Sequence, residues 1–279
     1  FRSSVVKKIF LFFCIQYALF ASEIPNFHDL SQCRGAVFLL TTPRSGSNLF
    51  SSGLSAITRR PISWLWWGDS VFAPGSDKKR HPSYNRLQLP MVSDRPLLYR
   101  SHYELKELSQ IPSDSNQLIF LTRNPKELIF RAYRLANPRK NEPDFGFIEN
   151  FLRGYLAPLK LFDSWDPDHR MLVYYEDLIA NENEIFLDVL RFMGVYPAYL
   201  DDFMANKEEY KKRALESYKR QHKRNNGGNS SVGAPKAIFY SLDARPEILS
   251  LIDEYIAKTE PYLWERYLKR FESRREIYD

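Results

Sequence analysis

The stretch AVFLLTTPRSGSNLFSSGLSAIT, residues 36–58, carries the pattern that decides the fold. An apolar run of β type, residues 36–40, leads into a small polar turn, after which apolar residues recur at helical spacing at Leu49, Leu54 and Ile57. The pattern predicts a strand, a loop and a helix in direct succession. The first N–H groups of such a helix have no partner within it, so they and the helix dipole can hold an anion. The turn therefore predicts a site for a phosphate or a sulfate.

The side chains of this turn suit the same role. Gly46 lets the backbone come close to a ligand, and Arg44 adds a charge that cannot be neutralised at ordinary pH. Ser45, Ser47 and Asn48 add hydroxyl and amide donors. The loop of nucleotide triphosphatases, G-x-x-x-x-G-K-[ST], has a first glycine and a lysine that are missing here. The turn is thus predicted to be a phosphate loop of another kind, the simpler alternative being an ordinary turn with an N-cap serine.

Length and composition favour a single α/β domain. The chain has 279 residues, of which 44% are hydrophobic, and no repeat is visible. Its 40 basic and 34 acidic residues form a mixed surface, and we predict no nucleic-acid partner. The two cysteines, Cys14 and Cys33, form no C-x-x-C pair, and H-E-x-x-H is absent, so neither a disulfide framework nor a zinc site is indicated. We predict no metal ion.

Residues 1–25 form a hydrophobic N-terminal segment that we assign to a signal peptide or a signal anchor. Lys7 and Lys8 precede an apolar run over residues 9–21. The run is shorter than the about 20 apolar residues that a transmembrane helix needs, although membrane association through residues 9–21 stays open. We expect a secreted or membrane-anchored protein of the secretory pathway, or a cytoplasmic one if the segment is a buried or interfacial helix. The main domain is expected over residues 34–279.

Three further apolar runs predict strands. They are PLLYRS (96–101), QLIFLTR (117–123) and HRMLVYYED (169–177), and helical patterns follow each of them. Alternating strands and helices imply a central parallel sheet with helices on both faces. Residues 59–95, rich in tryptophan and proline, are expected to form a long irregular connection whose tryptophans either line an acceptor pocket or cover the core.

Charged residues stand at the predicted strand ends, where open parallel sheets bind ligands. His102 follows the second strand and Arg123 ends the third. Arg123, with Arg131 and Arg134 in the following helix, predicts a second anion site. The alternatives are a surface histidine and solvated arginines.

The second half of the chain is predicted to be mainly helical. Residues 145–162 and 178–193 each have helical periodicity, and Gly194 is expected to end the second helix. Residues 245–271 should form helix along the outside of the sheet. Between them, the basic, glycine-rich residues 219–233 form either a loop that closes over an anion or a disordered surface loop.

The order of these motifs resembles the sulfotransferase family that uses 3′-phosphoadenosine 5′-phosphosulfate (PAPS). TTPRSGSN is similar to that family's 5′-phosphosulfate loop, and YRSHYEL to the strand end that bears its catalytic histidine. LTRNPKELIFRAY resembles the 3′-phosphate segment, and VYYEDL the strand whose tyrosine lies near the adenine. The four matches occur in the family's order over residues 36–194.

The resemblance implies a role for each matching residue. It assigns the 5′-phosphosulfate to Arg44, Ser45, Gly46, Ser47 and Asn48, the 3′-phosphate to Arg123, the adenine region to Tyr175, and catalysis to His102 as base with Arg44. Arg131 stands where the family usually has a serine, so its contact with the 3′-phosphate would be ionic or lost. The family's basic, glycine-containing C-terminal segment is not recognisable, and neither is its short dimerisation motif, so the oligomeric state stays open.

The implied activity is transfer of a sulfuryl group from PAPS, as co-substrate, to a hydroxyl or amine of an unidentified acceptor. A neutral His102 would accept the acceptor's proton, and Arg44 would stabilise charge on the departing phosphate without a metal ion. One alternative is a P-loop small-molecule kinase with Glu176 or Asp177 as magnesium ligand, which the missing loop lysine disfavours. Another is a secreted, non-enzymatic module that binds acidic glycans through its basic surface.

Overall fold

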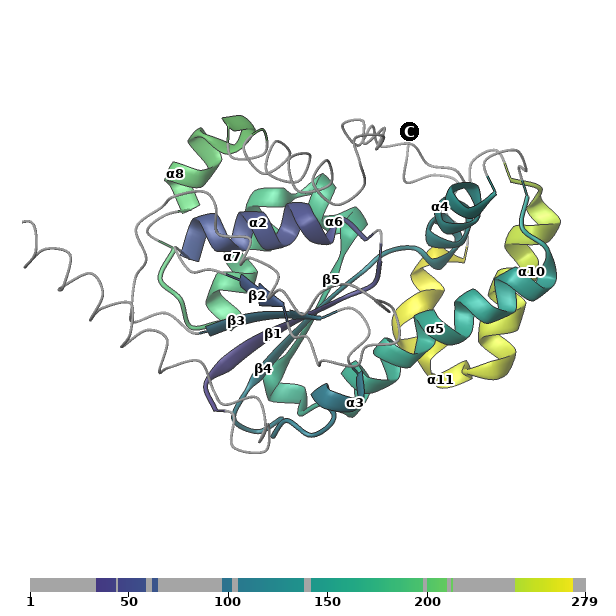
Figure 1. Cartoon of the computed structure of the whole chain (residues 1–279), viewed down its shortest axis with the longest axis horizontal. Coiled ribbons are helices and arrows are strands. Elements are labelled where there is room, and N and C mark those ends of the chain that lie inside the picture. Colours follow the sequence, from purple (N-terminus) through teal and green to yellow (C-terminus); the bar gives the residue numbers. More distant parts are fainter. Residues whose placement is uncertain are drawn as a thin grey trace, which may run out of the picture.

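A parallel sheet of five strands forms the centre of the molecule (Figure 1). The computed structural model describes residues 34–43, 45–58, 62–64, 97–101, 105–137, 142–197, 200–209, 212 and 244–272. The strand order is β2-β3-β1-β4-β5, and all neighbouring strands are parallel. The strands are β1 (Ala36–Thr41), β2 (Ile62–Trp64), β3 (Leu97–Ser101), β4 (Gln117–Thr122) and β5 (Arg170–Tyr174). The predicted strands and their parallel arrangement are thus confirmed.

Helices cover both faces of the sheet, as predicted (Figure 1). One face carries α2 (Ser47–Thr58), α6 (Tyr175–Ala180), α7 (Glu182–Phe192) and α8 (Leu200–Ala205). The other carries α3 (Leu105–Leu108), α4 (Pro125–Ala136), α5 (Phe145–Ser164), α10 (Pro246–Thr259) and α11 (Pro261–Leu263). A π-helical turn (Trp264–Leu268) and a 3-10 turn (Lys269–Phe271) follow α11, so the helical prediction for residues 245–271 is confirmed.

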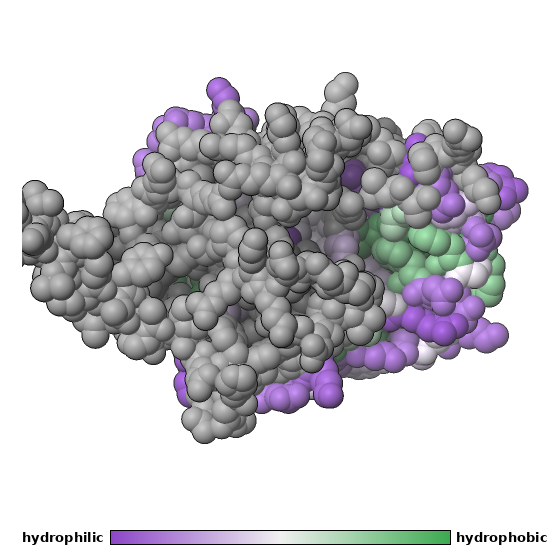
Figure 2. Space-filling view, in the orientation of Figure 1, coloured by the Kyte–Doolittle hydropathy of each residue, from purple (hydrophilic) through white to green (hydrophobic). Residues whose placement is uncertain are grey.

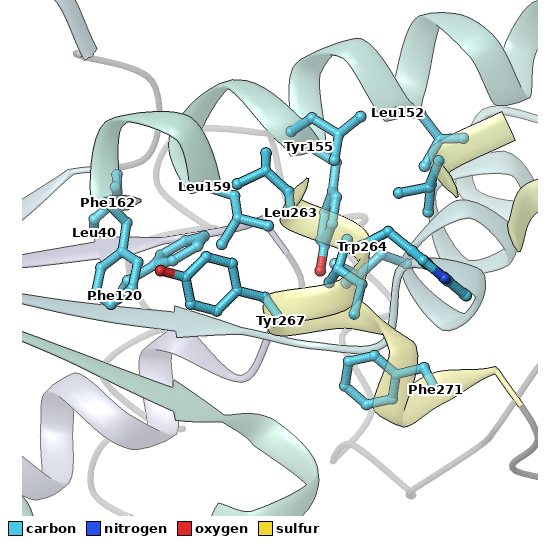
Figure 3. Packing of buried hydrophobic residues seen from close by; sticks show 14 of the residues in the cluster. Leu40, Phe120, Leu152, Tyr155, Leu159, Phe162, Leu263, Trp264, Tyr267 and Phe271 are labelled. Atoms are coloured by element: carbon cyan, nitrogen blue, oxygen red, sulfur yellow. The ribbon is translucent and has the colours of Figure 1, made fainter. Parts of the chain in front are cut away.

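Alternating side chains of each strand enter two separate hydrophobic clusters. In β1, Phe38 and Leu40 belong to the cluster on the α5 side, whereas Val37 and Leu39 belong to the cluster on the α2 side. Figure 3 shows how Leu40 and Phe120 of the sheet meet side chains from α5 and from the C-terminal turns. Burial of apolar surface on both faces is the main stabilising contribution to such a sheet.

Two predicted boundaries were wrong. The strand predicted over residues 169–177 ends at Tyr174, because β5 loses its neighbour where β4 ends: Thr122 pairs with Tyr174 in the last step of the ladder. The single helix predicted over residues 178–193 is two helices, α6 and α7, which meet at Asn181. The Asn181 N–H closes α6 on Asp177 O at 2.8 Å, while its carbonyl accepts from Ile185 N at 3.0 Å and begins α7.

Gly194 ends α7, as predicted. It has a φ of +65°, and its N–H donates to Arg191 O at 3.0 Å, while Val195 N donates to Leu190 O at 2.8 Å. The expected irregular connection over residues 59–95 contains β2, which at three residues is too short to show a periodicity. The rest of that connection, the hydrophobic residues 1–25 and the basic residues 219–233 lie outside the described residues.

Hydrophobic surface is visible in Figure 2 over the region where α4, α5 and α10 lie in Figure 1. Exposed residues of these helices include Phe145 and Leu251, and partly buried Phe147 and Tyr255 continue inward into the core cluster. Within the part of the chain that the structure describes, no helix combines the length and the apolar character needed to cross a membrane.

Candidate functional site

The carboxyl ends of the strands meet at one edge of the sheet. Leu40 of β1 pairs with Ser101, the last residue of β3, and Thr41 pairs with Leu121 of β4. Because the strands are parallel and their last paired residues are in register, β1, β3, β4 and β5 all end at this edge. This edge is where open parallel sheets bind ligands.

The turn after β1 is held by hydrogen bonds to the sheet and by hydrogen bonds within the turn. Thr42 N donates to Leu121 O of β4 at 3.1 Å. Ser45 directs its N–H and its hydroxyl to Thr42 O, at 3.2 and 2.6 Å. Since Ser45 is fully buried and both of these donors serve the turn, its described contacts shape the loop. Gly46 O then accepts from Phe50 N at 3.1 Å, which begins α2 and leaves the N–H groups of its first turn without an intrahelical partner.

Gly46 lies against the ring of Tyr175. Its φ is +80°, in the region that favours glycine, and a Cβ atom placed on it would come within 2.4 Å of Tyr175 Cδ2 and Cε2. Both the backbone conformation and the available space therefore require glycine. The contact joins the loop after β1, the predicted phosphate loop, to the segment after β5.

The same ring supports Arg123, directly after β4. The guanidinium carbon of Arg123 lies 4.3 Å from the centroid of the Tyr175 ring. This arginine is buried, with its Nη2 at 4.0 Å from Glu127 Oε2 and its Nε at 3.9 Å from Glu176 Oε1. Its carbonyl accepts from the buried Tyr155 hydroxyl at 3.1 Å. The ring, the carboxylates and the hydroxyl together fix Arg123 beside the loop.

The helix that follows Arg123, α4, begins at a capped turn. Asn124 precedes Pro125 at the first helical position, and its side chain accepts from Lys126 N at 3.0 Å. Asn124 N donates to Glu176 Oε1 at 3.0 Å. Burial raises the pKa of Glu176, while this backbone hydrogen bond and Arg123 oppose the shift. The start of α4 is therefore bound to the start of α6.

Arg131 lies in α4, eight residues after Arg123, which precedes the helix. Its Nε is 4.0 Å from Glu127 Oε2, so the fully buried Glu127 stands within 4.0 Å of both guanidinium groups. Arg131 keeps 19% of its side chain exposed. Glu127 and Arg131 are four residues apart in α4 and therefore lie on one face of the helix. Arg131 is thus a partly accessible cation beside the buried Glu127.

Arg100 of β3 was not among the predicted site residues. It is buried beneath the first turns of α2, where its Nη1 donates to Ser51 Oγ at 3.1 Å and its Nη2 to Ser47 Oγ. The signal available in the sequence was alternation, since Arg100 shares a strand face with the buried Leu98. A charged residue at a core-facing position of a strand is rarely fully buried unless it is paired, so its position indicates a buried partner.

The carboxylates considered as magnesium ligands are occupied within the fold. Glu176 accepts from Asn124 N, and both Asp177 oxygens accept from Arg270, at 2.9 and 2.6 Å. The structurally described residues contain no group of three or more histidine, cysteine, aspartate or glutamate side chains that could hold a metal ion. The specific magnesium ligands of the kinase alternative therefore find no support.

The structure brings together Ser45, Gly46, Ser47, Arg123, Arg131 and Tyr175. Arg44 and His102 lie outside the described residues, and Asn48 is described only by its backbone, in the first turn of α2. The roles of Arg44 and His102 stay predictions. What the described residues form is an edge at which the Tyr175 ring contacts both Gly46 of the loop after β1 and the buried guanidinium of Arg123.

Comparison with known proteins shows which family and which proteins this chain resembles. The sequence model of the sulfotransferase domain family matches residues 34–238 of this chain. Sulfotransferase 1A1 of Rattus norvegicus is 27% identical over 203 residues, which are 63% of this chain and 65% of the rat protein, so the match spans just under two thirds of that relative. Sulfotransferase 1A1 of Mus musculus is 22% identical over 222 residues, 69% of this chain and 72% of the mouse protein.

Solved structures show the same fold. The crystal structure of mouse sulfotransferase SULT7A1 complexed with PAP has a TM-score of 0.51 at 15% identity, over 84% of this chain and 90% of that one. Retinol dehydratase in complex with androsterone and inactive cofactor PAP has a TM-score of 0.56 at 16% identity, over 84% and 82%.

Proposed function

Because this chain belongs to the sulfotransferase family of enzymes, we propose that it transfers a sulfuryl group from PAPS to a hydroxyl or amine of an acceptor. The observation that carries the proposal is the Tyr175 ring, which contacts Gly46 of the phosphate loop and also lies 4.3 Å from the Arg123 guanidinium. A nucleotide with anionic groups at both its 5′ and 3′ positions needs two cationic loci at a fixed separation. A shared rigid ring between them supplies that fixed separation.

In the proposed complex the phosphate loop takes the 5′-phosphosulfate. The N–H groups at the start of α2, the Ser47 hydroxyl and the side chains of Arg44 and Asn48 are its donors. Arg123 and Arg131 take the 3′-phosphate, with Arg131 supplying an ionic contact in place of the usual serine hydroxyl. Tyr175 is assigned to the adenine region. Retinol dehydratase and mouse SULT7A1 were solved with PAP, which supports a related donor here.

Catalysis in this proposal is mainly positioning and charge stabilisation, as in phosphoryl transfer. His102 follows Ser101, the last residue of β3, and we assign it as the base that takes the proton of the attacking hydroxyl or amine. The acceptor oxygen or nitrogen bonds to sulfur as the bond from sulfur to the phosphate oxygen breaks. Arg44 and the loop N–H groups stabilise the charge that collects on the departing phosphate.

The proposal is tested by incubating the full chain with PAPS and a panel of phenols, sugars, lipid alcohols, amines and peptides, followed by mass spectrometry. A gain of one sulfuryl group on an acceptor, dependent on both PAPS and protein, is the expected result. In a parallel series, ATP and magnesium are used in place of PAPS. Phosphate transfer to an acceptor in that series would overturn the proposal in favour of a kinase. Salt-sensitive binding to sulfated glycans without any nucleotide effect would instead indicate a binding module.

A further inference from the structure

Arg100 holds two serine hydroxyls of α2 with a single guanidinium group. It is 1% exposed, and its Nη1 and Nη2 donate to Ser51 Oγ and Ser47 Oγ respectively. The two serines lie one helical turn apart and are themselves buried. The interior strand β3 is thereby hydrogen-bonded through a side chain to the first two turns of α2, the helix that follows the predicted phosphate loop.

The chemistry of the guanidinium sets the direction of these hydrogen bonds. Arginine has donors and no acceptor, so both serine oxygens must be acceptors toward it. Ser51 then uses its hydroxyl proton on Ser47 O, at 2.6 Å. Ser47 has one hydroxyl proton, and Arg100 cannot accept it. That proton is therefore directed away from Arg100.

Ser47 is the first residue of α2 and directly follows Gly46. The positive end of the helix dipole lies there, so a cation beneath this turn is unfavourable on its own and an anion above it relieves the repulsion. A hydroxyl that accepts from a cation also becomes a stronger donor, because successive hydrogen bonds polarise one another.

We propose that Arg100 is a positioning residue that orients and polarises the Ser47 hydroxyl, so that Ser47 donates its proton to the 5′-phosphosulfate of the donor nucleotide. This inference rests on the proposed function. It assigns Arg100 a role without direct contact with the ligand, since its charge acts through one hydroxyl. The same hydrogen bond would stabilise the negative charge that collects on the 5′-phosphate when sulfur departs.

The test compares two nucleotides that differ only at the 5′ position, adenosine 3′,5′-bisphosphate and adenosine 3′-monophosphate, by calorimetric titration of the full chain. Ser47→Ala and Arg100→Met should each weaken binding of the bisphosphate about tenfold, the loss expected for one charge-assisted hydrogen bond. Both should leave binding of the 3′-monophosphate unchanged. The double variant should bind the bisphosphate no more weakly than either single variant, because both changes remove the same hydrogen bond.

Thr58→Ala is the matched control, since Thr58 is a buried hydroxyl of the same helix that donates to Leu54 O at 2.6 Å. It should change neither affinity. Should Arg100→Met fail to fold, Arg100→Lys keeps the charge but not the two-pronged geometry, and it should still weaken the bisphosphate selectively. Equal losses for both nucleotides, or losses that add in the double variant, would overturn the inference. A wild-type chain that binds neither nucleotide would instead overturn the proposed function.

Discussion

Gly46 and Tyr175 are in direct contact across the edge of the sheet: a Cβ atom on Gly46 would lie 2.4 Å from two carbons of the Tyr175 ring. The ring also stacks with Arg123, so a single aromatic side chain touches both proposed anion sites. A displacement of the ring should therefore change the geometry of both proposed sites at once.

Gly46→Ala should disrupt this arrangement. The new methyl group meets the ring, and the backbone at a φ of +80° is strained for alanine by about 1–2 kcal/mol. We expect adenosine 3′,5′-bisphosphate to bind at least about tenfold more weakly, as measured by calorimetry. Gly35→Ala is the control, because Gly35 has a φ of +66° and nothing within 4 Å of an added Cβ. Equal nucleotide affinities of these two variants would contradict the role of the contact.

Arg123→Lys should weaken recognition of the 3′-phosphate while keeping a positive charge. Lysine cannot reproduce the planar guanidinium that stacks on Tyr175, nor its two-pronged contact with a phosphate. The affinity for adenosine 3′,5′-bisphosphate should fall roughly tenfold to a hundredfold, and that for adenosine 5′-monophosphate should not change. Arg153→Lys, in a solvent-exposed pair with Glu149, serves as the control. A similar loss for both nucleotides would show that Arg123 acts on the fold alone.

Arg270→Lys should reduce stability. Arg270 binds both oxygens of Asp177 and lies 4.0 Å above the Tyr174 ring, which ties the C-terminal turns to the start of α6. Loss of the two-pronged pair and of the stacking should lower the free energy of unfolding by about 1–2 kcal/mol in urea titrations. Arg191→Lys, in the exposed pair with Asp188, should change it by less than about 0.5 kcal/mol. Equal changes in the free energy of unfolding for the two variants would contradict this prediction.

Asp253→Asn should change how stability depends on pH. Lys126 Nζ lies 2.6 Å from Asp253 Oδ2, yet burial raises the pKa of this carboxyl from 3.8 to about 6. Between these values the folded protein binds a proton that the unfolded chain releases, so this group lowers the free energy of unfolding as the pH rises from 3.8 to about 6. That contribution is absent from the variant.

The measurement is urea unfolding of both proteins at pH 4 and pH 6. The variant is expected to be less stable overall, because Lys126 loses a buried partner. Its free energy of unfolding should nevertheless rise more, or fall less, between the two pH values than that of the wild type. Parallel pH curves would mean that Asp253 has no raised pKa in the folded protein.

Much of the site could be predicted because local patterns place residues at strand ends. An apolar run that stops at a small polar turn fixes β1, Gly46 and the start of α2, and Arg123 follows from the end of the next strong run. Parallel topology then brings these ends to one edge. Neither step needs information about distant contacts.

The rest depended on contacts that local patterns do not encode. Arg100 and Ser47 are 53 residues apart, and nothing near either of them indicates their hydrogen bond. The sequence VYY, residues 173–175, predicts a strand that continues past Tyr174. The ladder stops at Tyr174 because β4 has ended, and Tyr175 is the first residue of α6. The break at Asn181 likewise reflects two competing sets of backbone hydrogen bonds within one helical pattern.

The most direct measurement is calorimetric titration of the purified chain with adenosine 3′,5′-bisphosphate, adenosine 5′-monophosphate and adenosine 3′-monophosphate. If the loop at Gly46 and the guanidinium of Arg123 hold the two ends of one nucleotide, the bisphosphate should bind about a hundredfold more tightly than either monophosphate. A bisphosphate that binds no more tightly than the better monophosphate would contradict that claim.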